Sequence, residues 1–257
     1  MTDQINRTQG TGVGATMRGK VAIVTGAGSG LGQATALALS RRGARIAMID
    51  VSAGRLEQTA KHLGTSPAGA PLPVSLDVSN AEQVAAAVDR VVSELGRVDY
   101  LVNAAGIDYT LSIEELTVEQ YDRILGVNLR GPFLLMKAVF PHMRQTGGGH
   151  IVNIASTAAI RTWANASAYT ASKFGLVGLT RAIGVEGRPH NIKATTVFPG
   201  GMATNFFDRP DLEIKPDLTD LNDPANVAEV IAYVLEQPAR SVVQEVLVTP
   251  LTETSWP

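Results

Sequence analysis

Three side chains in the second half of the chain could carry acid–base chemistry. Ser156 follows a short apolar run, and Tyr169 and Lys173 lie thirteen and seventeen residues after it in a helical pattern. Because Tyr169 and Lys173 are four residues apart, one face of a helix carries both. A lysine ammonium beside a phenol stabilises the phenolate and lowers a phenol pKa that is ordinarily about 10. We therefore expect Tyr169 to serve as an acid or a base near neutral pH.

A glycine-rich turn follows the first apolar run. The chain reads Thr25-Gly-Ala-Gly-Ser-Gly-Leu-Gly32 immediately before a helical pattern. Glycines here permit a tight turn and let the backbone approach a pyrophosphate at the N-terminus of the helix. Glycine also serves ordinary strand-to-helix turns, but the position after the first strand of a β-α-β unit favours nucleotide binding. The residues expected to contact the nucleotide are Gly26, Ser29, Gly30, Leu31 and Gly32.

Asp50 ends the second apolar run, eighteen residues after Gly32. An acidic side chain at this point can accept bonds from both hydroxyls of an adenosine ribose, and it would repel a 2′-phosphate. Neither Ser29 nor Val51 supplies a cation for such a phosphate. We therefore predict a preference for NAD over NADP, with Asp50 and Val51 in the cofactor site. The alternative is that Asp50 only caps the segment that follows it.

Two further segments end apolar runs at the same predicted edge. Asp77 could accept a bond from the adenine amine, although it could equally cap the helix that begins near Ala81. The segment Asn103-Ala-Ala-Gly106 follows the fourth run, where small residues let the backbone crowd a flat ligand and the asparagine can bond a neighbouring strand. A purely structural turn is the alternative for Gly106. The residues expected to contact the cofactor here are Asp77, Val78, Asn103, Ala104 and Gly106.

A parallel sheet would bring these residues together. Short runs rich in branched side chains cover residues 21–25, 45–49, 98–103, 150–154, 193–198 and 245–249, and PLPVSL before Asp77 is a further strand-like run. Helical patterns cover residues 31–42, 81–95, 119–140, 168–184 and 225–236. Strands regularly separated by helices imply a parallel sheet covered on both faces. We predict a Rossmann-type, doubly wound α/β domain, with ligands beyond the carboxyl ends of the strands.

Composition limits the possible classes of function. The chain has 257 residues, 45% of them apolar, and a formal net charge of −2, which gives no basic surface for nucleic acid or anionic membranes. With no cysteine, the chain has no disulfide framework and no thiolate nucleophile. The four histidines lack metal-ligand spacing, so no metal is expected. We expect a soluble, cytoplasmic protein with one domain over residues 17–257 and a flexible extension over residues 1–16.

Taken together, these motifs resemble the short-chain dehydrogenase/reductase family over nearly the whole chain after Met17. The family pattern TGxxxGxG appears at residues 25–32 and the NAAG element at residues 103–106. The order and spacing of the family's catalytic tetrad are matched by Asn128, Ser156, Tyr169 and Lys173. The segment that contains Pro199, Gly200, Met202 and Thr204 resembles the family element that holds the nicotinamide carboxamide.

The resemblance implies a role for each member of the tetrad. Tyr169 would be the general acid in reduction and the general base in oxidation, and Ser156 would polarise the substrate oxygen. Lys173 would hold the nicotinamide ribose hydroxyls, and Asn128 would keep a water in place for proton relay. Structural alternatives exist for two of them: Asn128 could satisfy backbone groups in a helix distortion, and Ser156 could be an ordinary loop serine.

We therefore predict an NAD(H)-dependent oxidoreductase that acts on a medium-sized, partly apolar secondary alcohol or ketone. The resemblance also implies a homotetramer or a dimer, formed through the helices at residues 119–140 and 168–184. Two other functions stay open: a nicotinamide-binding sensor without turnover, and an NADPH-dependent ketoacyl-type reductase. The intact tetrad counts against the first and Asp50 against the second. The residues expected to border the substrate are Asp108, Tyr109, Arg161, Trp163, Asn165, Met202, Phe206 and Phe207.

Overall fold

The chain folds around a parallel β-sheet. The computed structural model describes residues 16–64, 68–208 and 217–253, so almost all of the expected N-terminal extension lies outside the described residues. Within these ranges seven strands form one sheet in the order β3-β2-β1-β4-β5-β6-β7, and every neighbouring pair is parallel. The predicted doubly wound α/β fold is confirmed. The strands are β1 Val21–Thr25, β2 Arg45–Asp50, β3 Leu72–Ser75, β4 Tyr100–Asn103, β5 Gly149–Ile154, β6 Ile192–Pro199 and β7 Glu245–Val248.

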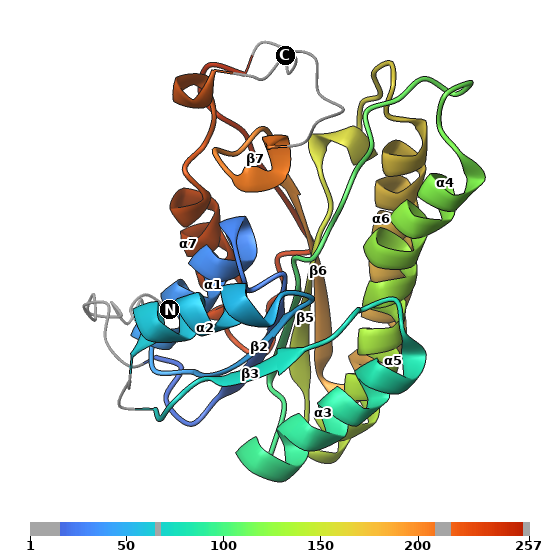
Figure 1. The fold of residues 1–257 in the computed structure, drawn as a ribbon. Helices are drawn as coiled ribbons and strands as arrows, with labels where there is room; N and C mark the ends of the chain where they lie inside the picture. The colour runs from blue at the N-terminus through green and yellow to red at the C-terminus, as the bar shows by residue number, and fades with distance from the viewer. Residues whose placement is uncertain (1–15, 65–67, 209–216, 254–257) are drawn as a thin grey trace, which may run out of the picture.

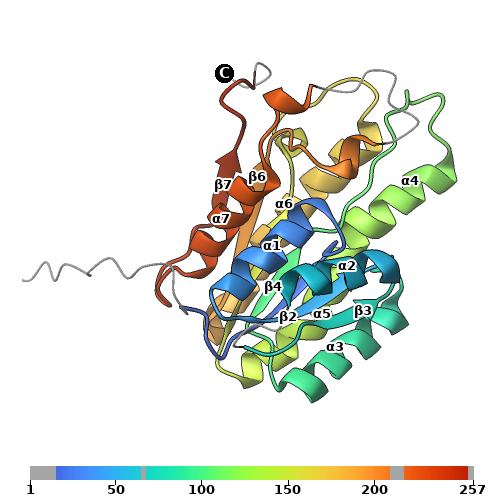
Figure 2. The same cartoon turned by 60° about the vertical axis from the view of Figure 1, so that its left-hand side comes forward.

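Helices cover both faces of this sheet. Figures 1 and 2 show α1, α2 and α7 on one face and α3, α4, α5 and α6 on the other. Contacts between helices follow the same division, since α1 packs against α7 and α2 while α3 packs against α5 and α4 against α6. The helices are α1 Gly30–Arg41, α2 Ala53–Leu63, α3 Ala81–Leu95, α4 Val118–Leu125, α5 Gly131–Gln145, α6 Ser167–Gly187 and α7 Pro224–Leu235.

Side chains of the central strand alternate between two cores. Ala22 and Val24 of β1 join the cluster under α1 and α7, whereas Val21 and Ile23 join the cluster under α3 and α5. All four residues are buried, as expected for a strand that is covered on both faces. Burial on both faces explains why β1 reads in the sequence as a continuous apolar run rather than an alternating one.

Two helices differ from the sequence prediction. Helix α2 was not predicted, although Leu56, Ala60 and Leu63 recur at helical spacing and pack against the core. The single helix expected over residues 119–140 is instead divided into α4 and α5 by a π-helical turn, Gly126–Arg130. This turn contains Asn128, one of the expected site residues.

The strand order reverses at β1, which lies between β2 and β4. In a doubly wound sheet the crevice for ligands opens at this point, beyond the carboxyl ends of the strands. No helix in the described part of the chain is both long and apolar enough to cross a membrane. The same residues contain no group of three or more acidic or histidine side chains arranged to hold a metal ion.

Candidate active site

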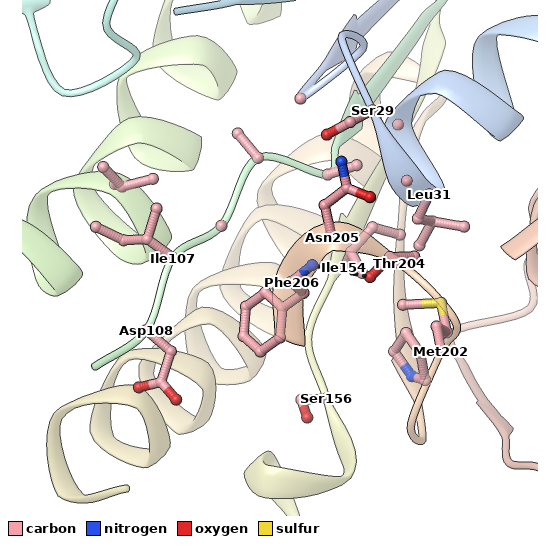
Figure 3. Close-up of a pocket in the computed structure, with 18 of the residues that line it drawn as sticks. Ser29, Leu31, Ile107, Asp108, Ile154, Ser156, Met202, Thr204, Asn205 and Phe206 are labelled. Atoms are coloured by element: carbon pink, nitrogen blue, oxygen red, sulfur yellow. Dashed lines mark hydrogen bonds between the residues drawn. The ribbon is translucent and has the colours of Figure 1, made fainter. Parts of the chain in front are cut away.

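A cleft of about 690 Å³ opens at the carboxyl ends of the central strands. Of the expected catalytic and cofactor-binding residues, only Asn103 and Asn128 do not line it, and both are buried behind its wall. Figure 3 shows Ser29 and Leu31 at one end of the cleft and Ser156 at the other. The expected residues that line the cleft are Gly26, Ser29, Gly30, Leu31, Gly32, Asp50, Val51, Asp77, Val78, Ala104, Gly106, Ser156, Tyr169, Lys173, Pro199, Gly200, Met202 and Thr204.

The glycine-rich turn forms one end of the cleft. Gly26 and Gly30 have positive φ angles of 65° and 52°, which favour glycine. A Cβ on Gly32 would lie 2.2 Å from the carbonyl oxygen of Gly26, so the turn leaves no room for a side chain there. Helix α1 begins at Gly30 without a side-chain cap and has no acidic residue in its first turn. Its N-terminus can therefore offer backbone N–H groups and a favourable dipole to a pyrophosphate, which fits a dinucleotide.

Hydrogen bonds and close packing hold two other segments against this turn. Thr25 accepts bonds through its Oγ1 from the backbone nitrogens of Ala104 and Ala105, both at 3.0 Å. On the opposite side, a Cβ on Gly30 would lie 3.2 Å from the Cγ2 of Thr204, which places the segment after Pro199 beside the turn. These contacts place the segments after β4 and β6 against the glycine-rich turn.

Asp50 is buried, and its carboxylate accepts three hydrogen bonds. The backbone nitrogens of Gly28 and Ser52 donate at 3.1 and 2.9 Å, and the Nη2 of Arg55 donates at 2.9 Å. The bond from Ser52, which is the N-cap of α2, shows that Asp50 also orders the segment that follows it. Sequence reasoning missed Arg55, a cation that lines the cleft beside Asp50.

Asp77 does not cap the following helix. The N-cap of α3 is Asn80, whose side chain accepts bonds from the first turn, so that alternative is wrong. Asp77 instead accepts bonds from the backbone and hydroxyl of Ser79 and, at 2.6 Å, from the Nη1 of Arg123 on α4. Partial burial raises the pKa of Asp77, but the bonds from Ser79 and Arg123 outweigh burial and hold that pKa below its ordinary value.

The two buried asparagines support the cleft from behind. Asn103 donates through its Nδ2 to the Oδ1 of Asn153 on the neighbouring strand at 2.7 Å, as expected. Asn128 holds the backbone of Ile107 from both sides: its Oδ1 accepts from the nitrogen at 2.9 Å and its Nδ2 donates to the oxygen at 2.8 Å. Its Nδ2 also donates to Ser172 on α6 at 3.1 Å. Asn128 therefore joins the π-helical turn, the NAAG loop and α6.

Lys173 and Tyr169 meet within the cleft. The Nζ of Lys173 lies 5.6 Å from the centre of the Tyr169 ring, and it donates to the carbonyl oxygen of Ile154 at 2.8 Å. Burial lowers the pKa of Lys173 to about 8, while the negative charge of Asp108 acts in the opposite direction. A Cβ on Gly106 would lie 3.5 Å from this Nζ, so the end of the NAAG element is close to the ammonium group.

Ser156 lines the cleft beyond β5. Its Oγ accepts a bond from the backbone nitrogen of Ala158 at 3.1 Å and so caps the short 3₁₀ helix Thr157–Ala159. The hydroxyl group has one hydrogen in addition to its acceptor lone pairs, so it can still donate to a substrate oxygen. Ser156 thus has a local structural role, as the loop-serine alternative held, and keeps the capacity for the chemical one.

Aromatic side chains line the other end of the cleft. The ring centres of Phe206 and Tyr169 are 5.8 Å apart, and those of Phe206 and Phe207 are 5.6 Å apart. Trp163, Met202 and Asp108 also line the cleft, as expected. Tyr109, Arg161 and Asn165 were expected to border the substrate but do not line the cleft. The lining residues that were not expected include Thr110, Thr157, Asn205 and Glu253.

Comparison with known proteins identifies the family. A family model described as short chain dehydrogenase matches residues 20–213. The chain belongs to the short-chain dehydrogenase/reductase family. It is 44% identical over 188 residues to the D-threitol dehydrogenase of Mycolicibacterium smegmatis. This alignment covers 73% of this chain and 72% of that enzyme. The short-chain dehydrogenase/reductase described here is therefore an NAD(P)-dependent oxidoreductase that acts on alcohol or ketone substrates.

Solved structures of other family members contain either cofactor. A metagenomic short-chain oxidoreductase in complex with NADP has a TM-score of 0.80 and 32% identity, covering 91% of this chain and 98% of that one. The 3-ketoacyl-(acyl-carrier-protein) reductase from Brucella melitensis, complexed with NADH, has a TM-score of 0.82 and 32% identity, covering 92% and 99%. The shared fold implies a nicotinamide cofactor in this chain, either NAD(H) or NADP(H).

Proposed function

We propose that this protein is an NAD(H)-dependent dehydrogenase that interconverts a secondary alcohol and a ketone. The observation that carries the proposal is that Ser156, Tyr169 and Lys173 line the same cleft as the glycine-rich turn. Hydride transfer between a dinucleotide and an alcohol needs both a cradle for the pyrophosphate and an acid–base group at the reacting oxygen. Both parts lie in one cleft here.

The proposed chemistry assigns the proton to Tyr169 and the developing charge to Ser156. A nicotinamide cofactor, when bound, supplies or accepts the hydride. In reduction the Tyr169 hydroxyl donates its proton to the carbonyl oxygen, and in oxidation the phenolate removes the proton from the alcohol. The Ser156 hydroxyl donates a hydrogen bond to the same oxygen, where it polarises the carbonyl and stabilises the alkoxide. The Lys173 ammonium favours the phenolate electrostatically.

Lys173 has a second task in this proposal, which is to hold the ribose next to the nicotinamide. One hydrogen of its ammonium is directed to Ile154, which leaves two for ribose hydroxyls or for a water. Asn128 uses both amide hydrogens on Ile107 and Ser172, so the relay water would bond to its remaining oxygen lone pair or to backbone carbonyls of the π-helical turn. Asn128 is thus a positioning residue that keeps a proton path next to Lys173.

The proposed preference for NAD(H) rests on Asp50. Its buried carboxylate lies at the end of β2, where ribose hydroxyls can donate to it and where a 2′-phosphate would meet a negative charge. Val51, which follows it and is 62% exposed, offers no cation. Isothermal titration with NADH and NADPH tests this preference directly.

We also propose that the protein forms a homo-oligomer, a dimer or a tetramer, through α4, α5 and α6. Phe133 on α5 and Phe174 on α6 are 44% and 46% exposed, and an apolar groove with Leu129 and Leu179 lies beside Phe133. Large exposed apolar side chains gathered on neighbouring helices are typical of a protein interface. Light scattering after size-exclusion chromatography measures the mass of the particle, and a monomer at micromolar concentration would contradict this part of the proposal.

The experiment that tests the catalytic proposal compares wild type with Tyr169→Phe. NADH oxidation is followed against ketones, a ketose and a β-ketoacyl thioester, and NAD⁺ reduction is followed against secondary alcohols and polyols such as D-threitol. We expect turnover by wild type and a loss of about 10²-fold to 10⁴-fold in the variant, with nucleotide binding retained. Equal turnover in both proteins would remove Tyr169 from the mechanism. Nucleotide binding without turnover on any substrate would favour the sensor alternative.

A further inference from the structure

In the wall of the cleft, the guanidinium of Arg55 lies within hydrogen-bonding distance of the Asp50 carboxylate. The Nη2 of Arg55 lies 2.9 Å from the Oδ1 of Asp50, and both side chains line the cleft. Arg55 stands in the first turn of α2, and this turn itself contains no acidic residue. A Cβ on Gly28 would lie 2.8 Å from the Cβ of Arg55 and from the Oδ2 of Asp50. The glycine-rich turn, the end of β2 and the start of α2 therefore meet at this ion pair.

We propose that Arg55 determines cofactor specificity, by making this site accept NADP(H) as a second and weaker cofactor beside NAD(H). The inference rests on the proposed function, since it concerns the ribose end of the same cofactor site. Asp50 alone would repel a 2′-phosphate, and a guanidinium at 2.9 Å offsets part of that charge and so weakens the repulsion. Arg55 can also bind a phosphate through two parallel N–H groups.

The two partners of the pair differ in their freedom to move. The side chain of Asp50 is 6% exposed, whereas that of Arg55 is 47% exposed. The half-exposed guanidinium stays hydrated in either position, and it exchanges one anionic partner for another when it turns from Asp50 toward a phosphate, so the net cost of this turn is small. Asp50 keeps its position when this happens, because the backbone nitrogens of Gly28 and Ser52 still donate to it. The site can thus present a carboxylate to a ribose hydroxyl or a guanidinium to a phosphate.

This arrangement predicts opposite effects for the two members of the pair. Replacing Arg55 removes the group that binds the phosphate but leaves Asp50 held by two backbone donors, so NADH binding changes little. Replacing Asp50 by asparagine removes the repulsion and releases Arg55, so NADPH binding improves. A purely structural ion pair would instead affect both nucleotides in the same direction.

The test measures binding of NADH, NADPH and 2′-AMP by isothermal titration calorimetry, at low and high salt. For Arg55→Met we expect the affinities for NADPH and 2′-AMP to fall about tenfold or more and the affinity for NADH to change by less than about threefold. Arg55→Lys keeps the positive charge but not the two parallel N–H groups of the guanidinium. Its affinities for NADPH and 2′-AMP should lie between those of wild type and Arg55→Met. Arg144→Met, which removes an exposed guanidinium that does not line the cleft, should change neither affinity.

Several results would overturn the inference. An equal loss of NADH and NADPH binding in Arg55→Met would make Arg55 a support for Asp50 and nothing more. Unchanged NADPH and 2′-AMP binding would show that the guanidinium does not reach the phosphate. Should Arg55→Met fold poorly, Asp50→Asn gives an independent reading, because a failure to improve NADPH binding contradicts the proposed repulsion. Failure of wild type to bind either dinucleotide would instead contradict the proposed function itself.

Discussion

The side-chain nitrogen of Lys173 lies 5.6 Å from the centre of the Tyr169 ring, one turn further along α6. This nitrogen is buried, and it donates a hydrogen bond to the carbonyl oxygen of Ile154. Burial lowers the pKa of Lys173 to about 8, against the opposing effect of Asp108. Burial of the charged Lys173 beside Tyr169 therefore lowers the free energy of unfolding, and the size of this effect depends on pH.

The first prediction concerns this pH dependence. Below the folded-state pKa of about 8, both the folded and the unfolded chain carry the charged lysine, and the full burial penalty is present. As the pH rises from there toward the ordinary value of 10.5, the unfolded chain binds more protons and the penalty is lost. Lys173→Met removes this penalty. Relative to wild type, the free energy of unfolding of the variant should therefore be higher at about pH 7 than at about pH 9.5, by ~2 kcal/mol.

Urea denaturation of wild type and variant at the two pH values measures this difference. Lys61→Met is the matched control, because Lys61 is exposed on α2 and does not line the cleft. Its effect on the free energy of unfolding should be the same at both pH values. An identical result for Lys173→Met would mean that the ammonium is not desolvated in the folded protein.

The second prediction separates two glycines. A Cβ on Gly32 would lie 2.2 Å from the carbonyl oxygen of Gly26, whereas a Cβ on Gly54, in the first turn of α2, has nothing within 4 Å. Gly32→Ala must displace the backbone of the turn, so it should destabilise the protein by about 3 kcal/mol and abolish dinucleotide binding. Gly54→Ala should stabilise it by a few tenths to about 1 kcal/mol, since alanine favours the helix.

Thermal unfolding and titration with NADH measure both effects. The two substitutions make the same chemical change, so any difference between them reports the surroundings of the glycine. If Gly32→Ala bound NADH with normal affinity, the tight packing of α1 against the turn would not be needed for the cradle.

Much of the fold could be predicted because its signals are local. The strands of a sheet covered on both faces are runs of branched apolar residues, and the turn after β1 needs glycine for steric reasons that the sequence displays. Tyr169 and Lys173 share a helix face through their spacing alone. For these elements, the residues that determine the structure are neighbours in the chain.

Some of the features that the sequence prediction missed depend on contacts between distant segments. Helix α2 is an exception, because Leu56, Ala60 and Leu63 recur at helical spacing and pack against the core, so its signal is local. Arg55 is only five residues from Asp50, and their contact depends on how the chain turns between β2 and α2. The partner of Asp77 is Arg123, forty-six residues away on α4. The π-helical turn at Asn128 likewise reflects the bonds that this residue makes to Ile107.

The third prediction tests the buried amide pair behind the NAAG element. Asn103 donates to Asn153 at 2.7 Å, and Asn153 in turn donates to the hydroxyl of Thr180 on α6 at 2.8 Å. Either asparagine, changed to alanine, leaves a buried polar group without its partner, which should cost about 2–4 kcal/mol. In the double variant both members of the pair are absent, so neither is left without its partner. The loss of stability in the double variant should therefore be at least about 1 kcal/mol smaller than the sum of the two single losses.

Urea denaturation of the single and double variants gives this coupling energy. Asn80→Ala, which removes the cap of α3, shares no hydrogen-bond partner with Asn103 in the described part of the chain and provides the additive comparison. Additivity in the Asn103 and Asn153 pair as well would mean that water replaces the lost partner without penalty.

The last prediction separates the two roles of Ser156. Its Oγ caps a short 3₁₀ helix by accepting from the nitrogen of Ala158, and Ser156→Ala should therefore cost about 1 kcal/mol of stability. The proposed hydrogen bond to the substrate oxygen adds a separate loss of about 10²-fold to 10³-fold in kcat, with NADH affinity unchanged. Thr117→Ala removes the comparable cap of α4, outside the cleft, and should lower stability to a similar extent without lowering kcat. Steady-state kinetics and thermal unfolding of both variants measure the two losses. If the losses in kcat were equally small, the contribution of Ser156 would be the cap alone, and another donor in the cleft would have to stabilise the alkoxide.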